Sequence, residues 1–485
     1  MNRLTRTLFT LAIVGSIAGC KVGPNYKRPV IDTPTSYRGA LAPDITNTAT
    51  TTTPLGAQKW NTVFTDPVLQ QLIAEALKNN YDVKIAADRV LEEQAQLGIT
   101  KAGQYPTLSV GATYDALGLP SSLLSGLSNN SSNSSSSNNN MQTNYFSGGL
   151  TASVAWNLDF WGYYRRQTEA ARASLRATEW ARQTTYSTLI ESVATAYYQL
   201  RTLDAELVIT RNTLDARKQS LDLTRKLEQG GAGSMADVRQ AEELYYAAQV
   251  QIPAIESQIE QQENNLRLLL GRDPGPIARS ESDSSIADAP HPASVPVGLP
   301  SDLLERRPDV RRAEELLIQA NANIGVARAE YFPQLSLSGS GGVASSQLEG
   351  LVNPANAYYY AVGSLSQPIF DAGRIRNNYR LAQATHQELL DTYQKTVAGA
   401  LRDVSNALVA YNKTREYREQ QEKQTAASVD AVRLARMRYS GGSTSYLEVL
   451  TNDTNLYNSQ LTLESAQEQE AQSLIQLYNA LGGGW

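Results

Sequence analysis

The chain of 485 residues contains two copies of one sequence unit, and this repeat limits the possible folds more than any other feature. An offset of 211 residues aligns Gly162 with Gly373 and Gly271 with Gly482, and the register between them holds without a gap. A second offset, of 227 residues, aligns the segment that starts at Tyr81 with the segment that starts at Pro308. The two halves are therefore expected to share one architecture.

The two offsets differ because the first copy carries an insertion between its two predicted strands. The insertion includes residues 127–140, which read LSNNSSNSSSSNNN. A low-complexity polar tract cannot pack into a core, so it is expected in a loop that faces open solvent. A Pro-rich segment, residues 272–300, joins the two copies and is expected to be an irregular connector.

Alternating polar and apolar residues predict two strands in each copy. After Pro106 the apolar residues Leu108, Val110, Ala112 and Tyr114 alternate with polar ones, which is typical of a strand with one apolar face. The predicted strands cover residues 106–118, 146–158, 333–343 and 358–370. Strands of about ten residues can cross a membrane when they are tilted.

Four strands cannot close a barrel by themselves. An open sheet edge in lipid leaves backbone groups without hydrogen bonds, at a cost of several kcal/mol each. We therefore expect the chain to share its barrel with copies of itself. The alternative, a soluble β-sandwich, would require many more strands at regular spacing.

Long helices are predicted after each strand pair. No proline occurs from Gly162 to Glu228, and Leu189, Val193, Ala196 and Leu200 recur at steps of four and three, as in a heptad pattern. Such a helix would be about 100 Å long at about 1.5 Å per residue. A return helix is expected from Ser234 to Leu270, with a kink or break at Pro253.

The N-terminus has the pattern of an export signal that ends in a lipobox. Arg3 and Arg6 precede a short apolar run, and small residues lead to Cys20, the only cysteine of the chain. Residues 1–19 are therefore predicted to be removed, and Cys20 is predicted to be acylated. A single cysteine also excludes an intramolecular disulfide.

Composition argues against two other classes of function. The formal net charge is −5 and no basic run occurs, so a nucleic-acid partner is not expected. The two histidines, His291 and His386, are too few and too scattered for a metal or acid–base site. No catalytic residue, metal site or cofactor is predicted, and the chain is interpreted as a non-enzyme.

Several strings resemble the TolC-like outer-membrane efflux family, and within it the acylated branch of nodulation-type multidrug efflux lipoproteins. The resemblance covers essentially the whole mature chain, and its most specific strings are those at Arg306–Asp309 and Pro368–Gly373. The strings are Val22-Gly23-Pro24-Asn25-Tyr26, Phe64-Thr65-Asp66-Pro67, Arg306-Arg307-Pro308-Asp309-Val310, Gln367-Pro368-Ile369-Phe370-Asp371-Ala372-Gly373-Arg374 and Arg438-Tyr439-Ser440-Gly441-Gly442.

The resemblance implies a mainly α-helical homotrimer. Three chains with four strands each would form one twelve-stranded barrel in the outer membrane, and their helices would form a tunnel that extends into the periplasm. The implied function is an outer-membrane channel of a tripartite efflux system, a passive conduit for drugs or other small molecules. The alternative is the exit duct of a type I protein-secretion system.

The resemblance also implies where partners bind. A periplasmic adaptor and an inner-membrane pump, of the RND type as the first choice, would meet the two helical turns at the periplasmic tip. The residues assigned to the tip are Gly230, Gly231, Ser234, Gly441, Gly442 and Ser445. Rings of carboxylates narrow the tip in the family, and the candidates here are Asp237, Glu448 and Asp453, although a solvated surface charge is an equally good interpretation of Glu448.

These expectations divide the chain into six segments. They are the signal peptide at residues 1–19, an extended segment at 20–60 after the acylated cysteine, the first repeat at 61–271, the connector at 272–300, the second repeat at 301–482 and a short tail at 483–485.

Overall fold

The computed structural model describes residues 21–38, 54–119, 143–279 and 295–484. Contacts divide the chain into two compact units. The sheet unit contains residues 93–175 and 317–389 together with the segment before Pro29. The hairpin unit contains residues 29–92, 176–316 and 390–485. Cys20, the polar tract at 127–140 and His291 lie outside the described residues.

The sheet unit holds one antiparallel sheet of four strands, as predicted. The strands are β1 (Thr107–Leu119), β2 (Thr143–Leu158), β3 (Gln334–Ser345) and β4 (Ala357–Ser366). They pair in the order β1-β2-β3-β4. The strand pairs of the two repeats therefore lie next to each other, joined by the β2–β3 ladder, and β1 and β4 are left as the two edges.

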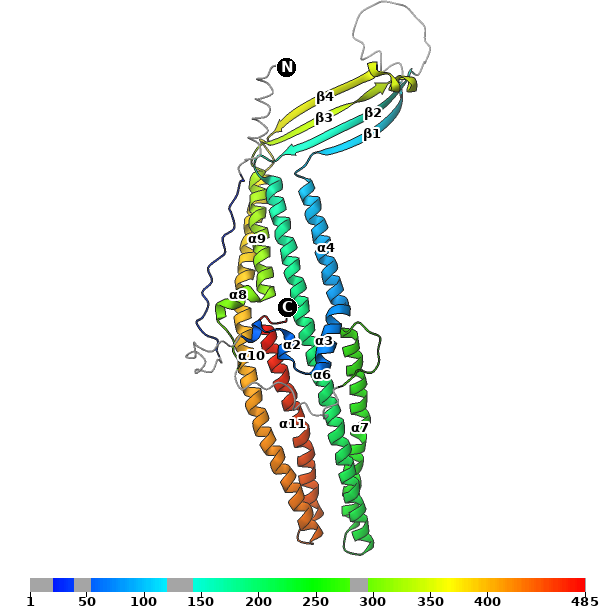
Figure 1. Cartoon of the computed structure of the whole chain (residues 1–485), viewed down its shortest axis with the longest axis vertical. Helices are drawn as coiled ribbons and strands as arrows, with labels where there is room; N and C mark the ends of the chain where they lie inside the picture. The colour runs from blue at the N-terminus through cyan, green and yellow to red at the C-terminus, as the bar shows by residue number, and fades with distance from the viewer. Residues whose placement is uncertain (1–20, 39–53, 120–142, 280–294, 485) are drawn as a thin grey trace, which may run out of the picture. The chain divides into compact units, whose positions relative to one another are not determined.

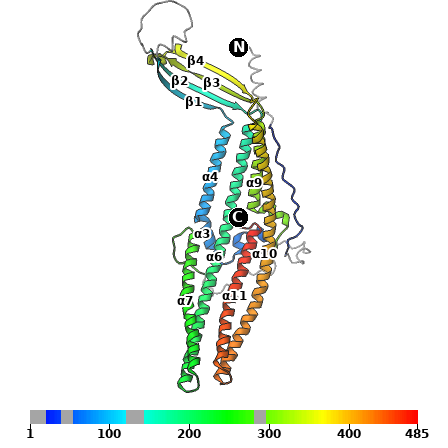
Figure 2. The same cartoon turned by 180° about the vertical axis from the view of Figure 1, so that it is seen from behind.

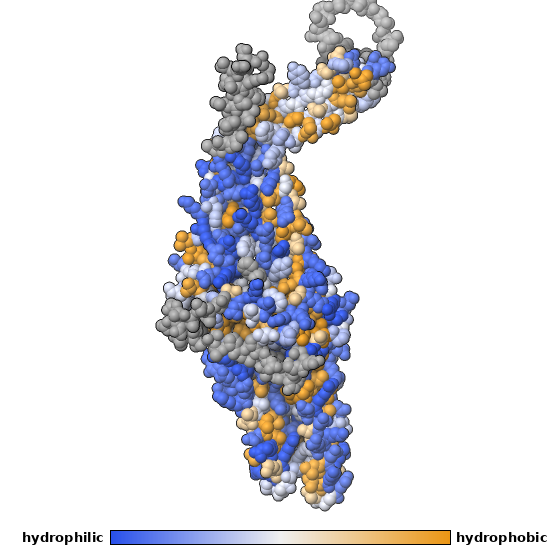
Figure 3. Space-filling view, in the orientation of Figure 1, coloured by the Kyte–Doolittle hydropathy of each residue, from blue (hydrophilic) through white to orange (hydrophobic). Residues whose placement is uncertain are grey.

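Apolar side chains on these strands are exposed in the single chain. Leu108 and Val110 on β1, and Tyr359 and Leu365 on β4, are the clearest examples. Figure 3 shows hydrophobic residues gathered along the strands, whereas hydrophilic residues dominate the visible surface of the helices. A sheet with exposed apolar faces and two open edges is typical of a surface that is covered in the assembled protein.

The fourth strand is shorter than predicted. It ends at Ser366, whereas the alternation of apolar residues predicts an end at residue 370. Pro368 has no backbone N–H to donate to a ladder, which explains why the strand stops before it. Ile369 and Phe370 remain highly exposed beyond the strand end.

The helices occur in pairs of equal length, which confirms the repeat. Helices α4 (Tyr81–Ala102) and α9 (Pro308–Ala329) have 22 residues each. Helices α6 (Tyr163–Gln229) and α10 (Arg374–Ser440) have 67 residues each, and α7 (Met235–Leu269) and α11 (Tyr446–Ala480) have 35 each. No described helix combines the length and the hydropathy needed to cross a membrane.

Short helical segments occur in the rest of the described part of the chain. They are η2 (Leu55–Ala57), α2 (Trp60–Val63), α3 (Pro67–Asn79), η4 (Pro300–Asp302), α8 (Leu303–Arg306), η5 (Leu348–Val352) and η6 (Pro354–Asn356).

The sequence predicts a kink or a break at Pro253, and the helix does not break there. Helix α7 runs from Met235 to Leu269 with the proline inside it. Proline removes one backbone hydrogen bond from a helix interior. Helix α7 contacts α6 on both sides of the proline, through Arg217 with Leu244 and through Arg211 with Glu256. Ala248 and Ile255, also on opposite sides of the proline, are buried.

Two helical hairpins dominate the hairpin unit. Figures 1 and 2 show α7 beside α6 and α11 beside α10. The predicted heptad residues of α6 are buried, with Val193 and Leu200 fully covered. They belong to a core that also contains α3, α7, α10 and α11 residues such as Ile73, Leu266, Val404 and Leu477.

Candidate functional site

The turns that close the two hairpins have the same backbone geometry. Gly231 and Gly442 have positive φ values of 73° and 70°. In each turn the backbone N–H of the first glycine donates a hydrogen bond back into the preceding helix. Gly230 donates to the Lys226 carbonyl oxygen, and Gly441 donates to the Met437 carbonyl oxygen. Glycine adopts positive φ without strain, so the glycine pairs allow the tight reversal that the sequence predicts.

The first turn continues into α7 through a reciprocal cap. Ser234 Oγ accepts a hydrogen bond from the Asp237 backbone N–H at 3.2 Å, and the Asp237 carboxylate accepts one from the Ser234 N–H at 3.2 Å. The carboxylate of Asp237 therefore supports the start of its own helix.

The second turn is held differently. Ser445 occupies the equivalent position before α11, but its side chain makes no capping bond. Arg438 Nη1 donates to Glu448 Oε1 at 2.7 Å, and the Thr444 hydroxyl donates to the other oxygen of the same carboxylate. Glu448 thus links the end of α10 to the start of α11 and is partly neutralised within the chain.

Asp453 joins three helices and is buried. Arg217 Nε on α6 donates to Asp453 Oδ2 at 2.9 Å, and Arg436 Nη2 on α10 donates to Oδ1 at 3.0 Å. Arg217 also donates to the Leu244 carbonyl oxygen on α7 and lies over the Tyr457 ring. The structure therefore places this candidate constriction residue in an ion pair between the two hairpins.

An apolar cluster is formed by the same helices, and its Tyr446 interacts electrostatically with the charges of this ion pair. It contains Leu221, Val238, Ala241, Ala435, Tyr446 and Val449. The Tyr446 hydroxyl lies 3.2 Å from Ser220 Oγ on α6, so α6 and α11 are in direct contact near both turns.

The repeat register explains half of this network. The 211-residue offset aligns Arg436 and Asp453 with Arg225 and Glu242, which form a 2.9 Å ion pair within the first hairpin. Arg217 aligns with Ser428 and has no equivalent in the second copy. Arg217 was not predicted as a site residue. The signal that could have identified it is an arginine that differs from its repeat partner on a helix rich in buried residues.

Arg166 holds the segment that follows Cys20. Its guanidinium is fully buried and donates to the carbonyl oxygens of Val22 and Gly23, at 3.1 and 3.0 Å, and to Asn25 Oδ1 at 3.1 Å. Asn321 Nδ2 donates to the Pro24 carbonyl oxygen at 3.1 Å. The string that begins at Val22 is thus bound to α6 and α9, a role that sequence reasoning did not assign to Arg166.

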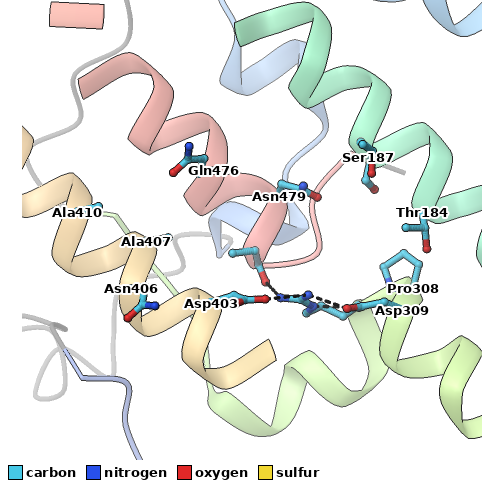
Figure 4. A pocket seen from close by; sticks show the side chains of 13 residues that line it. Thr184, Ser187, Pro308, Asp309, Asp403, Asn406, Ala407, Ala410, Gln476 and Asn479 are labelled. Carbon is cyan, nitrogen blue, oxygen red and sulfur yellow. Dashed lines mark hydrogen bonds and ion pairs between the residues drawn. The ribbon is translucent and has the colours of Figure 1, made fainter. Parts of the chain in front are cut away.

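The other specific strings also fix backbone geometry. Arg307 donates to both oxygens of Asp309 and to the Ala480 carbonyl oxygen, beside a cavity of about 480 Å³ (Figure 4). Asp371 accepts hydrogen bonds from the Gly373 and Ile375 N–H groups at the start of α10. Both strings therefore position the ends of helices.

Two tandem repeats of a strand pair and a long helical hairpin, with exposed apolar side chains on the strands, define the class of outer-membrane channel proteins. The chain belongs to the outer membrane efflux protein family, whose model matches residues 72–272 and 299–483.

Relatives that are named as efflux proteins match this chain along nearly their full length. The toluene efflux pump outer membrane protein TtgC of Pseudomonas putida is 33% identical over 485 residues, which cover 99% of this chain and 96% of the relative. The cation efflux system protein CusC of Escherichia coli is 31% identical over 478 residues, which cover 98% of this chain and 99% of the relative.

Solved structures show the same fold. The open state of the Neisseria gonorrhoeae MtrE outer membrane channel matches with a TM-score of 0.84 at 29% identity and covers 96% of this chain and 98% of its own. A membrane protein from Pseudomonas aeruginosa matches with a TM-score of 0.84 at 28% identity and covers 96% of this chain and 100% of its own. The chain is an outer-membrane efflux channel, and the predicted family, fold class and outer-membrane location are confirmed.

Proposed function

We propose that three copies of this chain form one passive conduit in a tripartite efflux system, which exports small molecules through the outer membrane. The observation that carries this proposal is the four-stranded sheet with two open edges and exposed apolar side chains on β1 and β4. Three such sheets joined edge to edge would give a closed ring of strands, in which every backbone group has a partner.

Energy for transport would come from partners. The relatives are named as outer membrane proteins of efflux pumps, which supports an inner-membrane pump, of the RND type as the first choice, and a periplasmic adaptor. The chain itself is proposed to have no catalytic activity. Among the described residues no group of three potential metal ligands comes together, and the carboxylates near the turns are tied into caps and ion pairs.

The two hairpin turns are proposed as the adaptor contact and Cys20 as the lipid anchor. The matching geometry at Gly231 and Gly442 supports two equivalent contacts in each chain. The lipobox supports acylation at Cys20, and Arg166 binds the backbone only two residues farther along the chain.

Reconstitution in a host that lacks its own efflux channel tests this function. The chain, co-expressed with the adaptor and pump genes from the same locus, should restore dye efflux and resistance. Tryptophan at Gly441 should abolish efflux and cross-linking to the adaptor while the amount of trimer stays unchanged. Full efflux by the Gly441→Trp variant would contradict the assignment of the turns, and activity of the isolated chain on a substrate would contradict the proposed channel role.

A further inference from the structure

Three carboxylates lie along the contact between α6 and α11, and one of them, Glu206, is within electrostatic range of the other two. The contact between these helices includes the Thr210–Tyr457 hydroxyl pair at 3.1 Å and a hydrogen bond from Asn479 to Glu191. Glu206 on α6 and Glu464 and Glu468 on α11 lie between these two points in the sequence of each helix. Electrostatic repulsion acts from Glu206 on Glu464 and from Glu468 on Glu206.

Glu464 is the most buried member of this cluster. Glu464 is only 9% exposed, and its Oε2 atom accepts no hydrogen bond from any residue that the structure describes. One turn along the same helix, Gln467 is 7% exposed, and its Oε1 atom also has no donor in the described part of the chain. Two buried acceptor atoms without hydrogen-bond donors lower the stability of the folded chain, unless a bound proton supplies a donor.

No cation acts on the Glu464 carboxylate among the described residues, and arginines of α6 and α10 pair with other carboxylates. Arg201 and Arg211 on α6 pair with Asp66 and Glu256. On α10, Arg418 pairs with Glu422 and Glu470. The remaining carboxylate, Glu468, accepts a hydrogen bond from Gln472 at 2.6 Å and so has a neutral partner.

A proton on Glu464 would resolve both problems. The protonated carboxyl group has an O–H donor, and residues three apart on a helix are close enough for it to reach Gln467. Protonation also removes the repulsion from Glu206. The first repeat supplies the contrast, because its position equivalent to Glu464 is Pro253, which cannot titrate.

We propose that the α6–α11 contact is a proton-binding site, in which Glu464 holds a proton while the two hairpins are packed and releases it when they separate. The link to channel opening rests on the function proposed above. The proton comes from solvent and returns to solvent, so no other reactant is needed.

The direction of the pH effect follows from the packing. Burial, followed by repulsion from Glu206, raises the pKa of Glu464 from 4.5 to about 7 in the packed state. A raised pKa means that packing is most favourable at low pH and weakens as the pH rises from 4.5 to 7. The shift corresponds to a change of roughly 300-fold in the packing equilibrium, complete above pH 7.

Infrared titration of the detergent-extracted protein tests the proton site. Wild-type protein should show a protonated-carboxyl C=O band that disappears with a midpoint near pH 7 and is absent from Glu464→Gln. The matched control, Glu260→Gln, changes an exposed glutamate on α7 and should keep the band. Glu206→Gln removes the repulsion and should lower the midpoint. A band that is missing in wild type, or unchanged in Glu464→Gln, would overturn the proposal.

Planar-bilayer recordings test the link to opening. Open probability of the wild type and of Glu260→Gln should rise between pH 5 and 8, whereas Glu464→Gln should stay at its low-pH value throughout. A normal pH response in Glu464→Gln would overturn the switch even if the infrared band is present. Protein that conducts at no pH would instead contradict the proposed channel function and leave the infrared result to decide the proton site.

Discussion

Asp453 shows how a single buried carboxylate joins both hairpins. Arg217 and Arg436 approach it from different helices, and all three interact electrostatically with Tyr446 of the apolar cluster. Because the carboxylate is almost fully buried, loss of one arginine leaves its charge only half compensated.

We expect Arg217→Met to loosen the contact between the hairpins. Breaking a buried ion pair by removing one partner costs about 3 kcal/mol. Hydrogen exchange at the amides of residues 446–456 should therefore show a smaller free energy of local opening by about that amount. Arg211→Met removes the exposed pair with Glu256 and is expected to change it by less than about 1 kcal/mol. Equal effects of the two variants would show that Arg217 has no special role.

Glu448 is expected to contribute more to ion selectivity than Asp237. Asp237 is occupied by its helix cap, whereas Glu448 is bound by Arg438, whose side chain is itself more than half exposed. In a trimer three copies of Glu448 would attract cations. Glu448→Ala should reduce the cation preference measured as a reversal potential in a salt gradient, and Asp237→Ala should have a smaller effect. Unchanged selectivity in Glu448→Ala would remove this residue from the constriction.

At the scale of elements, the β2–β3 ladder joins the two repeats into one sheet. Gly342 on β3 faces the Leu150 backbone, and a Cβ atom there would lie 2.0 Å from the Leu150 carbonyl oxygen. The neighbouring Gly341 would bring its Cβ no closer than 3.5 Å to any atom.

Gly342→Ala should therefore disrupt the sheet, whereas Gly341→Ala should be tolerated. We expect the first variant to give much less folded trimer on semi-native electrophoresis and a loss of strand signal in circular dichroism. The second variant should match the wild type in both measurements. A normal yield of Gly342→Ala trimer would mean that β2 and β3 separate easily at this point.

Periodicity and repetition were sufficient to predict the four strands and the long helices. Alternation along β1 and the heptad spacing on α6 are local patterns, so residues such as Leu108 and Val193 could be assigned to a strand and to a helix core from the sequence alone. The continuity of α7 through Pro253 could not be predicted, because neighbouring helices hold that helix together.

Charged residues were harder to place, for a different reason. Arg166, Arg217 and Glu464 resemble ordinary surface charges in the sequence, and only contacts with segments far away in the chain bury them. The carboxylates chosen for the constriction were visible as residues near the turns, but their partners depend on how two hairpins meet. No single-helix pattern contains that information.

For the whole molecule, the unpaired edges of β1 and β4 require a partner. We expect the detergent-extracted protein to have the mass of three chains in multi-angle light scattering with a correction for bound detergent. The physical reason is edge closure, since lipid offers no hydrogen bonds to an open strand. A stable monomer that retains all four strands would contradict this argument.

Acylation at Cys20 is expected to be separable from assembly. Cys20→Ser should abolish incorporation of radiolabelled palmitate, while trimers still form, because the strands provide an independent hold on the membrane. Mass spectrometry of the N-terminal peptide from outer membranes provides the check. An unmodified Cys20, or a retained Met1, would show that the lipobox is not used.

The equal lengths of the paired helices have a consequence for how the channel could change over time. Three chains with two matching halves would provide six similar helical hairpins, yet the two halves are encoded separately and can accumulate different substitutions. Arg217 opposite Ser428, and Glu464 opposite Pro253, are such differences. An assembly of six identical single-repeat subunits would have to carry every charge six times. Because both halves are encoded in one gene, the trimer can carry a proton-binding carboxylate at the three positions of Glu464. The three equivalent positions, which hold Pro253, then carry no titratable group.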